Sequence, residues 1–231
     1  MIHVCKLKII YKLIYIVRII LNILIYLRIV FAILFINFNI EIEEVFMAEG
    51  KFGNPGAVAM GAFALTTFVL SCGNAGLVPA AIFGVLPLAL LYGGLTQFLA
   101  GWFEFVTGNT FGMVVFTGYG AFWMTFALLV YMGVIWKWMP MDAFNAAVGL
   151  FLIAWTIFNT LLTIQVFKTK STLLISIFLL LEITFILLVI GHYSGINSIT
   201  QAGGYTGILL ALDAWYGMFT EISKHFDLMK A

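Results

Sequence analysis

Apolar runs of about 20 residues, separated by short polar breaks, dominate the sequence after Met47. A helix needs about 20 predominantly apolar residues to cross the hydrocarbon core of a bilayer. The breaks contain Gly, Asn, Pro or Lys, which punctuate regular structure. The pattern therefore predicts an all-α membrane protein with six transmembrane helices, near residues 57–77, 80–103, 111–136, 145–167, 172–192 and 203–222.

Composition supports a lipid environment and excludes several classes of protein. The chain is 64% hydrophobic and only 9% charged, whereas soluble domains carry about 25% charged residues. A net charge of +1 gives no indication of nucleic acid binding. Cys5 and Cys72 lie far apart and predict neither a disulfide framework nor a metal site. We expect the bilayer as a partner, and no metal or cofactor.

Lysines are distributed unequally over the loops between these spans. An even number of spans places both termini on one side, and that side receives Lys51, Lys168, Lys170, Lys224 and Lys230. The other side receives Lys137. Short loops rich in Lys and Arg tend to stay in the cytoplasm. The sequence therefore predicts a multi-pass protein of the plasma membrane with both termini cytoplasmic.

Residues 1–46 differ in composition from the rest of the chain. They contain fourteen Ile and no Gly, Pro, Ser, Thr or Trp, whereas all 22 Gly follow Met47. AT-rich codons encode such a composition, so one interpretation is translated upstream sequence with Met47 as the true start. The alternative is an extra hydrophobic helix at 13–36, which is long enough to span but contains two arginines. A signal peptide fits less well, because no small-residue cleavage site follows. We expect a doubtful extension at 1–46 and a six-span domain at 47–231.

Polar side chains inside the predicted spans are costly and therefore candidates for function. The amide of Gln97 can donate and accept hydrogen bonds, which suits either a carboxylate or acid solute or a bond between helices. Glu104 ends the second span, where it can relay a proton or interact with the N-terminus of the third helix. Glu182 and Asp213 lie in the last two spans, and each is interpreted either as a proton relay or as a paired structural acid.

Glycine and proline predict how the spans pack and bend. Glycines recur within the spans, for example at Gly61, Gly101 and Gly120. Small residues let helices approach closely in lipid, where no hydrophobic force drives them together. Pro87 lies inside the second span and should kink it, because proline lacks the backbone N–H.

Three stretches together carry a more specific signal. Residues 54–61 read Asn-Pro-Gly-Ala-Val-Ala-Met-Gly, residues 92–101 contain Tyr-Gly-Gly, Gln and Ala-Gly, and residues 104–123 contain the block Gly-Asn-Thr-Phe-Gly. In this combination the chain resembles the acetate uptake transporter family, also called the succinate–acetate permease family, over residues 51–226. Glu182 and Asp213 depart from the family pattern, which leaves the coupling ion and the solute preference open.

The resemblance implies six transmembrane helices per subunit around a narrow pore, assembled as a homohexamer. It places a hydrophobic constriction at Phe63, Tyr119 and Leu181, which plain core packing would also explain. Two aromatic rings and a branched aliphatic side chain can form a narrow, dewettable neck, and the Tyr119 hydroxyl could orient a carboxylate. Polar contacts along the path are expected from Asn54, Asn74, Gln97 and Asn109.

The function that the resemblance implies is transport of acetate and similar short monocarboxylates, with succinate as a further candidate, by proton symport or as a channel. The alternative is a channel or exporter for ammonia, ammonium or another small neutral solute. A membrane-embedded enzyme is disfavoured, because the sequence contains no H-E-x-x-H, no G-x-S-x-G and no Cys/His cluster at ligand spacing.

Overall fold

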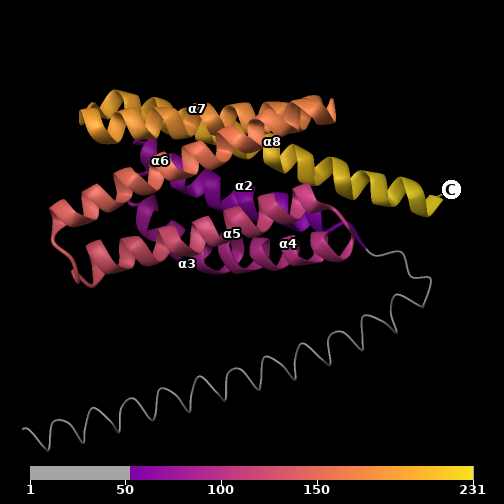
Figure 1. Ribbon diagram of the computed structural model, residues 1–231, viewed down its shortest axis with the longest axis horizontal. Coiled ribbons are helices and arrows are strands. Elements are labelled where there is room, and N and C mark those ends of the chain that lie inside the picture. The colour runs from indigo at the N-terminus through magenta and orange to yellow at the C-terminus, as the bar shows by residue number, and fades with distance from the viewer. Residues whose placement is uncertain (1–52, 231) are drawn as a thin grey trace, which may run out of the picture. The chain divides into compact units, whose positions relative to one another are not determined.

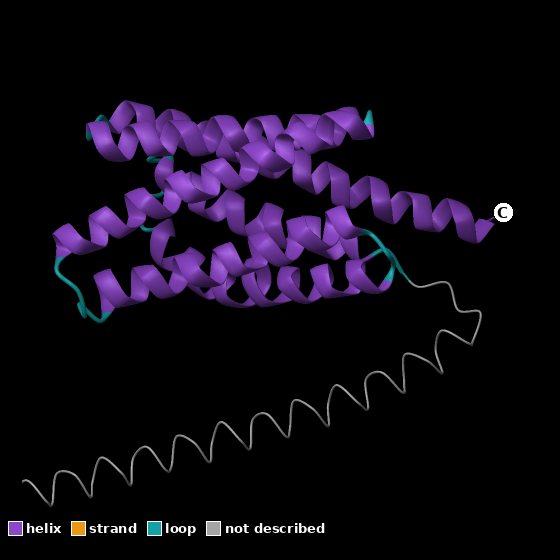
Figure 2. Ribbon diagram, viewed as in Figure 1, coloured by secondary structure: helices purple, strands orange, loops and turns teal. Residues whose placement is uncertain are grey.

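The structure is a computed structural model that describes residues 53–230, so the predictions about residues 1–46 lie outside the described residues. In this part of the chain, Figure 2 shows helices joined by short loops. Their bounds are α2 Pro55–Asn74, α3 Ala81–Leu90, a π-helical segment Leu91–Thr96, α4 Gln97–Val106, α5 Thr110–Val130, a π-helical segment Tyr131–Ile135, α6 Met141–Val166, a 3-10 turn Phe167–Thr169, α7 Thr172–Ser194 and α8 Asn197–Lys230.

The predicted all-helical membrane fold is confirmed. Five helical stretches within the described residues are long and apolar enough to cross a membrane: Pro55–Asn74, Ala81–Val106, Thr110–Ile135, Met141–Thr169 and Thr172–Ser194. The sixth predicted span corresponds to α8, which is longer than the predicted 203–222 and less apolar than the others. Charged residues such as Glu221 and Lys224 end its apolar run, but the helix continues through them.

The helices form two groups with α2 between them. Figure 1 shows α3 and α4 end to end alongside α5 below α2, and α7 beside α8 above it. α2 contacts α8 on one side and α4 on the other, while α6 packs mainly on α7. α3, the π-helical segment and α4 form one continuous span, and successive spans run in alternating directions, so α2, α5 and α7 begin at the same end of the bundle. That end therefore also holds the last residues of α4.

Glycine lets α4 and α5 approach to backbone contact, as the sequence predicted. A methyl group on Gly120 would lie 2.5 Å from the Phe98 backbone nitrogen, and one on Gly101 would lie 2.5 Å from the Thr117 nitrogen. The second span loses its α-helical pattern at the π-helical segment Leu91–Thr96 rather than at Pro87 itself. The wide π-turn ends directly before Gln97, and such turns are frequent at functional sites.

Candidate functional site: a cavity that ends at an aromatic neck

A cavity of about 210 Å³ enters the bundle at the end where α2 and α5 begin. One face of each of five helices lines it, because the lining positions recur every three or four residues, as at Leu174, Ile177, Phe178 and Leu181 of α7. It runs from the exposed Asn54 to the buried Phe63. At 1.5 Å per helical residue, this corresponds to a depth of about 14 Å.

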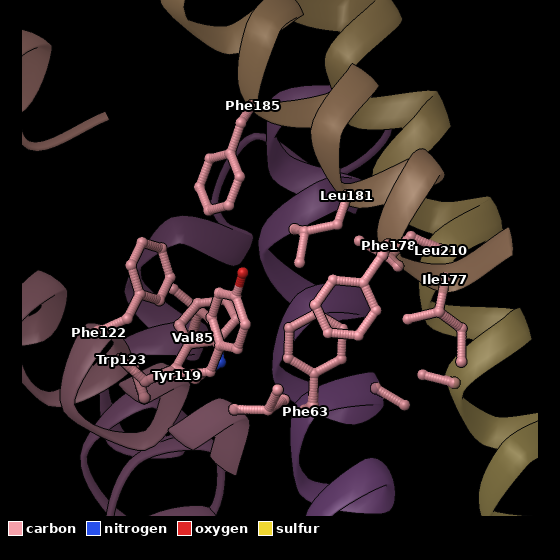
Figure 3. Close-up of a cluster of buried hydrophobic side chains, with 14 of the residues drawn as sticks. Phe63, Val85, Tyr119, Phe122, Trp123, Ile177, Phe178, Leu181, Phe185 and Leu210 are labelled. Carbon is pink, nitrogen blue, oxygen red and sulfur yellow. The ribbon is translucent and has the colours of Figure 1, made fainter. Parts of the chain in front are cut away.

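Phe63, Tyr119 and Leu181 lie together at the inner end of this cavity. They come from α2, α5 and α7 and are 7%, 2% and 6% exposed. The rings of Phe63 and Tyr119 meet edge to face with their centroids 5.8 Å apart. Figure 3 shows these side chains within the buried apolar cluster, with Phe178 beside them. We call the three residues the neck.

Two asparagine–glutamate pairs line the cavity at its outer end. Asn54 caps α2 by accepting from the Gly56 N–H at 2.8 Å, and its Nδ2 donates to Glu221 at 2.7 Å. Asn109 caps α5 by accepting from a backbone N–H at 3.0 Å, and its Nδ2 donates to Glu104 at 2.7 Å. The sequence predicted Asn54 and Asn109 as solute contacts. Both line the cavity, but their amides are already engaged in helix caps and in bonds to carboxylates.

Replacing Gly112 with Ala should disturb the pair formed by Asn109 and Glu104. The added methyl would lie 2.6 Å from Asn109 Nδ2 and 2.8 Å from Glu104 Cδ. Loss of an N-cap costs about 0.5–2 kcal/mol, so we expect a lower melting temperature in detergent, measured by tryptophan fluorescence. Gly84→Ala is the matched control, because nothing lies within 4 Å of a methyl there. Equal melting temperatures for the two variants would contradict this packing.

Gln97 is the amide in the cavity wall that keeps an unused hydrogen-bonding atom. It is 1% exposed, and its Oε1 has no hydrogen-bond partner. Among the described residues, Thr67 Oγ1 and Trp123 Nε1 are the other buried side-chain atoms without a partner, and neither residue lines the cavity. A buried unpaired oxygen is costly. Because Gln97 lines the cavity, its amide is a candidate contact for a solute or a water molecule.

The Tyr119 hydroxyl points to a polar network behind the neck. It donates to Asn159 Oδ1 at 2.7 Å, and Asn159 Nδ2 donates to Glu182 Oε2 at 2.6 Å. Glu182 also accepts from the Thr160 hydroxyl at 2.6 Å. Sequence reasoning missed Asn159, although it is fully buried in the middle of an apolar span. Its position deep in the fourth span was the signal that could have identified it.

The predicted proton-relay residues are not brought together. Glu104 lines the cavity, whereas Glu182 and Asp213 are not among the lining residues. Glu182 reaches the neck only through Asn159, and an asparagine side chain has no titratable group. Asp213 accepts a hydrogen bond from the Ser176 hydroxyl, which makes it a paired acid between α7 and α8. Asn74 ends α2 at the opposite end from the cavity mouth.

These features define a class: a polytopic α-helical membrane protein whose bundle encloses a small cavity that ends at an aromatic neck. The sequence profile described as the GPR1/FUN34/yaaH family matches residues 37–228, and the chain belongs to this family. The match begins before Met47 and is thus longer than the predicted 51–226. The interpretation of Met47 as the true start stays a prediction.

Known relatives agree with this assignment. Acetate permease A of Emericella nidulans is 36% identical over 189 residues, and Ammonia transport outward protein 2 of Saccharomyces cerevisiae is 37% identical over 182 residues. Each alignment covers 75% of this chain and 62% of the relative, so the chain spans less than two thirds of their length. The solved structure of the bacterial acetate channel SatP is 30% identical in sequence, with a TM-score of 0.70. It covers 76% of this chain and 94% of that one.

Proposed function

We propose that the chain transports acetate and similar short monocarboxylates across the membrane, with succinate as a further candidate. The observation that carries the proposal is the cavity that ends at the neck of Phe63, Tyr119 and Leu181. Pockets for drug-sized ligands occupy about 300–1,000 Å³, and this cavity has about 210 Å³. Its size therefore suits a solute of a few heavy atoms. The names of the acetate permease and of the acetate channel support the same solute class.

The charges in the wall bear on the form in which the solute crosses. Among the described residues that line the cavity there is no Lys, Arg or His, whereas Glu104 and Glu221 are both present. A carboxylate anion would meet repulsion there, while an undissociated acid, or an anion accompanied by a proton, would not. Proton-coupled transport is therefore favoured over passage of the bare anion. Weak binding also suits rapid flux, since a site must release what it binds.

Orientation and assembly belong to the same proposal. The cavity mouth shares its end of the bundle with Lys168, Lys170 and Lys224, while Lys137 lies between α5 and α6 at the other end. Applying the positive-inside rule, we propose that the mouth and both termini lie on the cytoplasmic side of the plasma membrane. We further propose a homohexamer with one pore in each subunit, on the strength of the family resemblance.

Purified protein in liposomes tests the transport proposal directly. We expect labelled acetate to accumulate when the vesicle interior is more alkaline than the outside, faster than in protein-free liposomes of the same lipid. The comparison with protein-free liposomes corrects for acetic acid that crosses the lipid bilayer without the protein. Equal rates with and without protein, for acetate and for succinate, would reject the proposal.

Replacing Tyr119 with Ala should widen the neck. The ring packs against Phe63, Phe122, Trp155 and Phe158, and removing it leaves a gap at the inner end of the cavity. We expect about threefold faster acetate uptake and weaker discrimination against longer monocarboxylates, with the protein still folded. Tyr205→Ala is the control, because that side chain is 51% exposed. Unchanged rate and selectivity would count against the neck.

The second candidate function is passage of ammonia or ammonium. Two carboxylates in the cavity wall suit a cation or a hydrogen-bond donor, and one relative is named an ammonia transport outward protein. The same liposomes distinguish the two functions, because ammonia entry makes the interior alkaline and acid entry makes it acidic. A pH-sensitive dye inside the vesicles reports the sign.

A further inference from the structure

The hydrogen-bonding partners of Asn159 fix the orientation of its amide. Its Nδ2 lies 2.6 Å from Glu182 Oε2, 3.3 Å from the Phe178 carbonyl and 3.4 Å from Thr163 Oγ1. The carbonyl and the carboxylate oxygen act as acceptors, and Thr163 already donates its hydrogen to the backbone carbonyl of Asn159 at 2.8 Å. The NH₂ group must face these oxygens, and consequently Oδ1 faces Tyr119.

The orientation of Asn159 determines what Tyr119 can do at the neck. Because Asn159 Oδ1 carries no hydrogen, the Tyr119 hydroxyl has to donate across the 2.7 Å contact. Its single hydrogen is then directed toward α6, to a residue that does not line the cavity. The neck is left with an aromatic ring and the oxygen lone pairs of Tyr119. A carboxylate, which needs donors, finds no free hydroxyl there.

Charge in the cavity wall points the same way. The carboxylates of Glu104 and Glu221, each of which accepts an amide hydrogen from an asparagine, add acceptors to the wall. Among the described residues that line the cavity, no Lys, Arg or His balances them. An acceptor-rich path favours a solute that brings its own hydrogen, as an undissociated carboxylic acid does.

We propose that Asn159 and Glu182 are positioning residues that keep the hydrogen of the Tyr119 hydroxyl directed away from the cavity, so that the neck offers no hydroxyl donor to a carboxylate, and that they thereby select the protonated acid over its anion. The proposal rests on the transport function proposed above and specifies which form of the solute passes. Glu182 acts through the orientation of Asn159 and needs no proton transfer to or from the neck.

A double-mutant cycle tests the proposal. In liposomes we would measure labelled acetate uptake under two conditions. The first is uptake driven by membrane potential at about pH 8, where short carboxylic acids are ionised, and the second is uptake driven by a pH gradient at about pH 5.5. The quantity compared between variants is the ratio of the first uptake rate to the second. Asn159→Ala frees the Tyr119 hydrogen to bind an anion, so this ratio should rise about threefold or more. In a Tyr119→Phe background the same change should leave the ratio within twofold, because no hydroxyl remains.

Variants of Glu182 provide an independent route to the same result. Glu182→Leu removes the shortest of the three contacts that orient the Asn159 amide, so the ratio should rise, and Tyr119→Phe should again abolish the rise. Glu182→Gln keeps an oxygen for Asn159 and should behave like the unaltered protein. Thr156→Val is the matched control on α6, because that hydroxyl donates to the Leu152 carbonyl of its own helix at 2.7 Å.

The outcomes separate this inference from the transport proposal. A rise in the ratio that depends on the Tyr119 hydroxyl supports it. The inference would be overturned, with the transport proposal intact, if the uptake ratio changed equally with and without the Tyr119→Phe substitution. It would also be overturned if neither Asn159→Ala nor Glu182→Leu changed the ratio. Absence of protein-dependent acetate uptake in the unaltered protein would reject both. Because the Glu182 variants leave Asn159 in place, a folding failure of Asn159→Ala does not remove the test.

Discussion

Gly120→Leu is expected to yield no folded protein in detergent extracts. A methyl group at this position would lie 2.5 Å from the Phe98 backbone nitrogen and 2.7 Å from its Cα, far inside the 3.5–4.0 Å at which carbon atoms attract. The contact is with backbone, so no side-chain rotation can relieve it. Overpacking by a methylene costs about 1–3 kcal/mol, and Leu adds several carbons. α4 and α5 would have to separate, and the part of the cavity wall that these two helices form would be disrupted.

A graded series identifies close packing as the cause. Gly120→Ala should lower the melting temperature and Gly120→Leu should abolish the folded peak in size-exclusion chromatography. Gly84→Leu, on the open face of α3, should retain that peak, because nothing lies within 4 Å of a methyl there. Recovery of folded Gly120→Leu in normal yield would mean that α4 and α5 do not meet at this glycine.

The membrane fold was predictable because its determinants are local. The length and apolarity of each run define a span. Because backbone groups in lipid must be hydrogen-bonded within the segment, each span of this kind forms a helix. The first five predicted spans therefore agree with the structure to within a few residues. The ends of α8 were not predictable in this way, because a helix can continue through charged residues after apolarity ends. The π-helical segment Leu91–Thr96 was also missed, since Pro87 indicated an interruption but not its form.

The site was predictable as a set of residues but not as a set of interactions. Phe63, Tyr119 and Leu181 came from family resemblance, and all three lie at the inner end of one cavity. The sequence could not show that the Asn54 and Asn109 amides are engaged, because their partners Glu221 and Glu104 are set by how the helix ends meet. Asn74 was predicted as a polar contact along the path, yet it ends α2 at the opposite end from the cavity mouth. Asn159 links residues far apart in sequence, which only packing reveals.

Gln97→Leu should reduce acetate uptake at least about fivefold while leaving the protein as stable as before. Gln97 lines the cavity, and its Oε1 is buried without a hydrogen-bond partner. A hydrogen bond from a passing acid to this oxygen would recover its lost solvation, worth about 1–3 kcal/mol, or roughly 5- to 150-fold in rate. Leu has a similar volume and no polar atom, so the variant loses that interaction without leaving a large void.

Stability and transport should therefore separate in this variant. A buried acceptor without a partner destabilises the folded state, so replacing Gln97 by an apolar residue should keep or raise the melting temperature. Gln165→Leu is the matched control, because that side chain is exposed and accepts only from Lys168 at 2.8 Å, and its uptake should not change. If Gln97→Leu transported acetate normally, Oε1 would not contact the solute. If it lost stability and transport together, the amide would instead hold the helices in place.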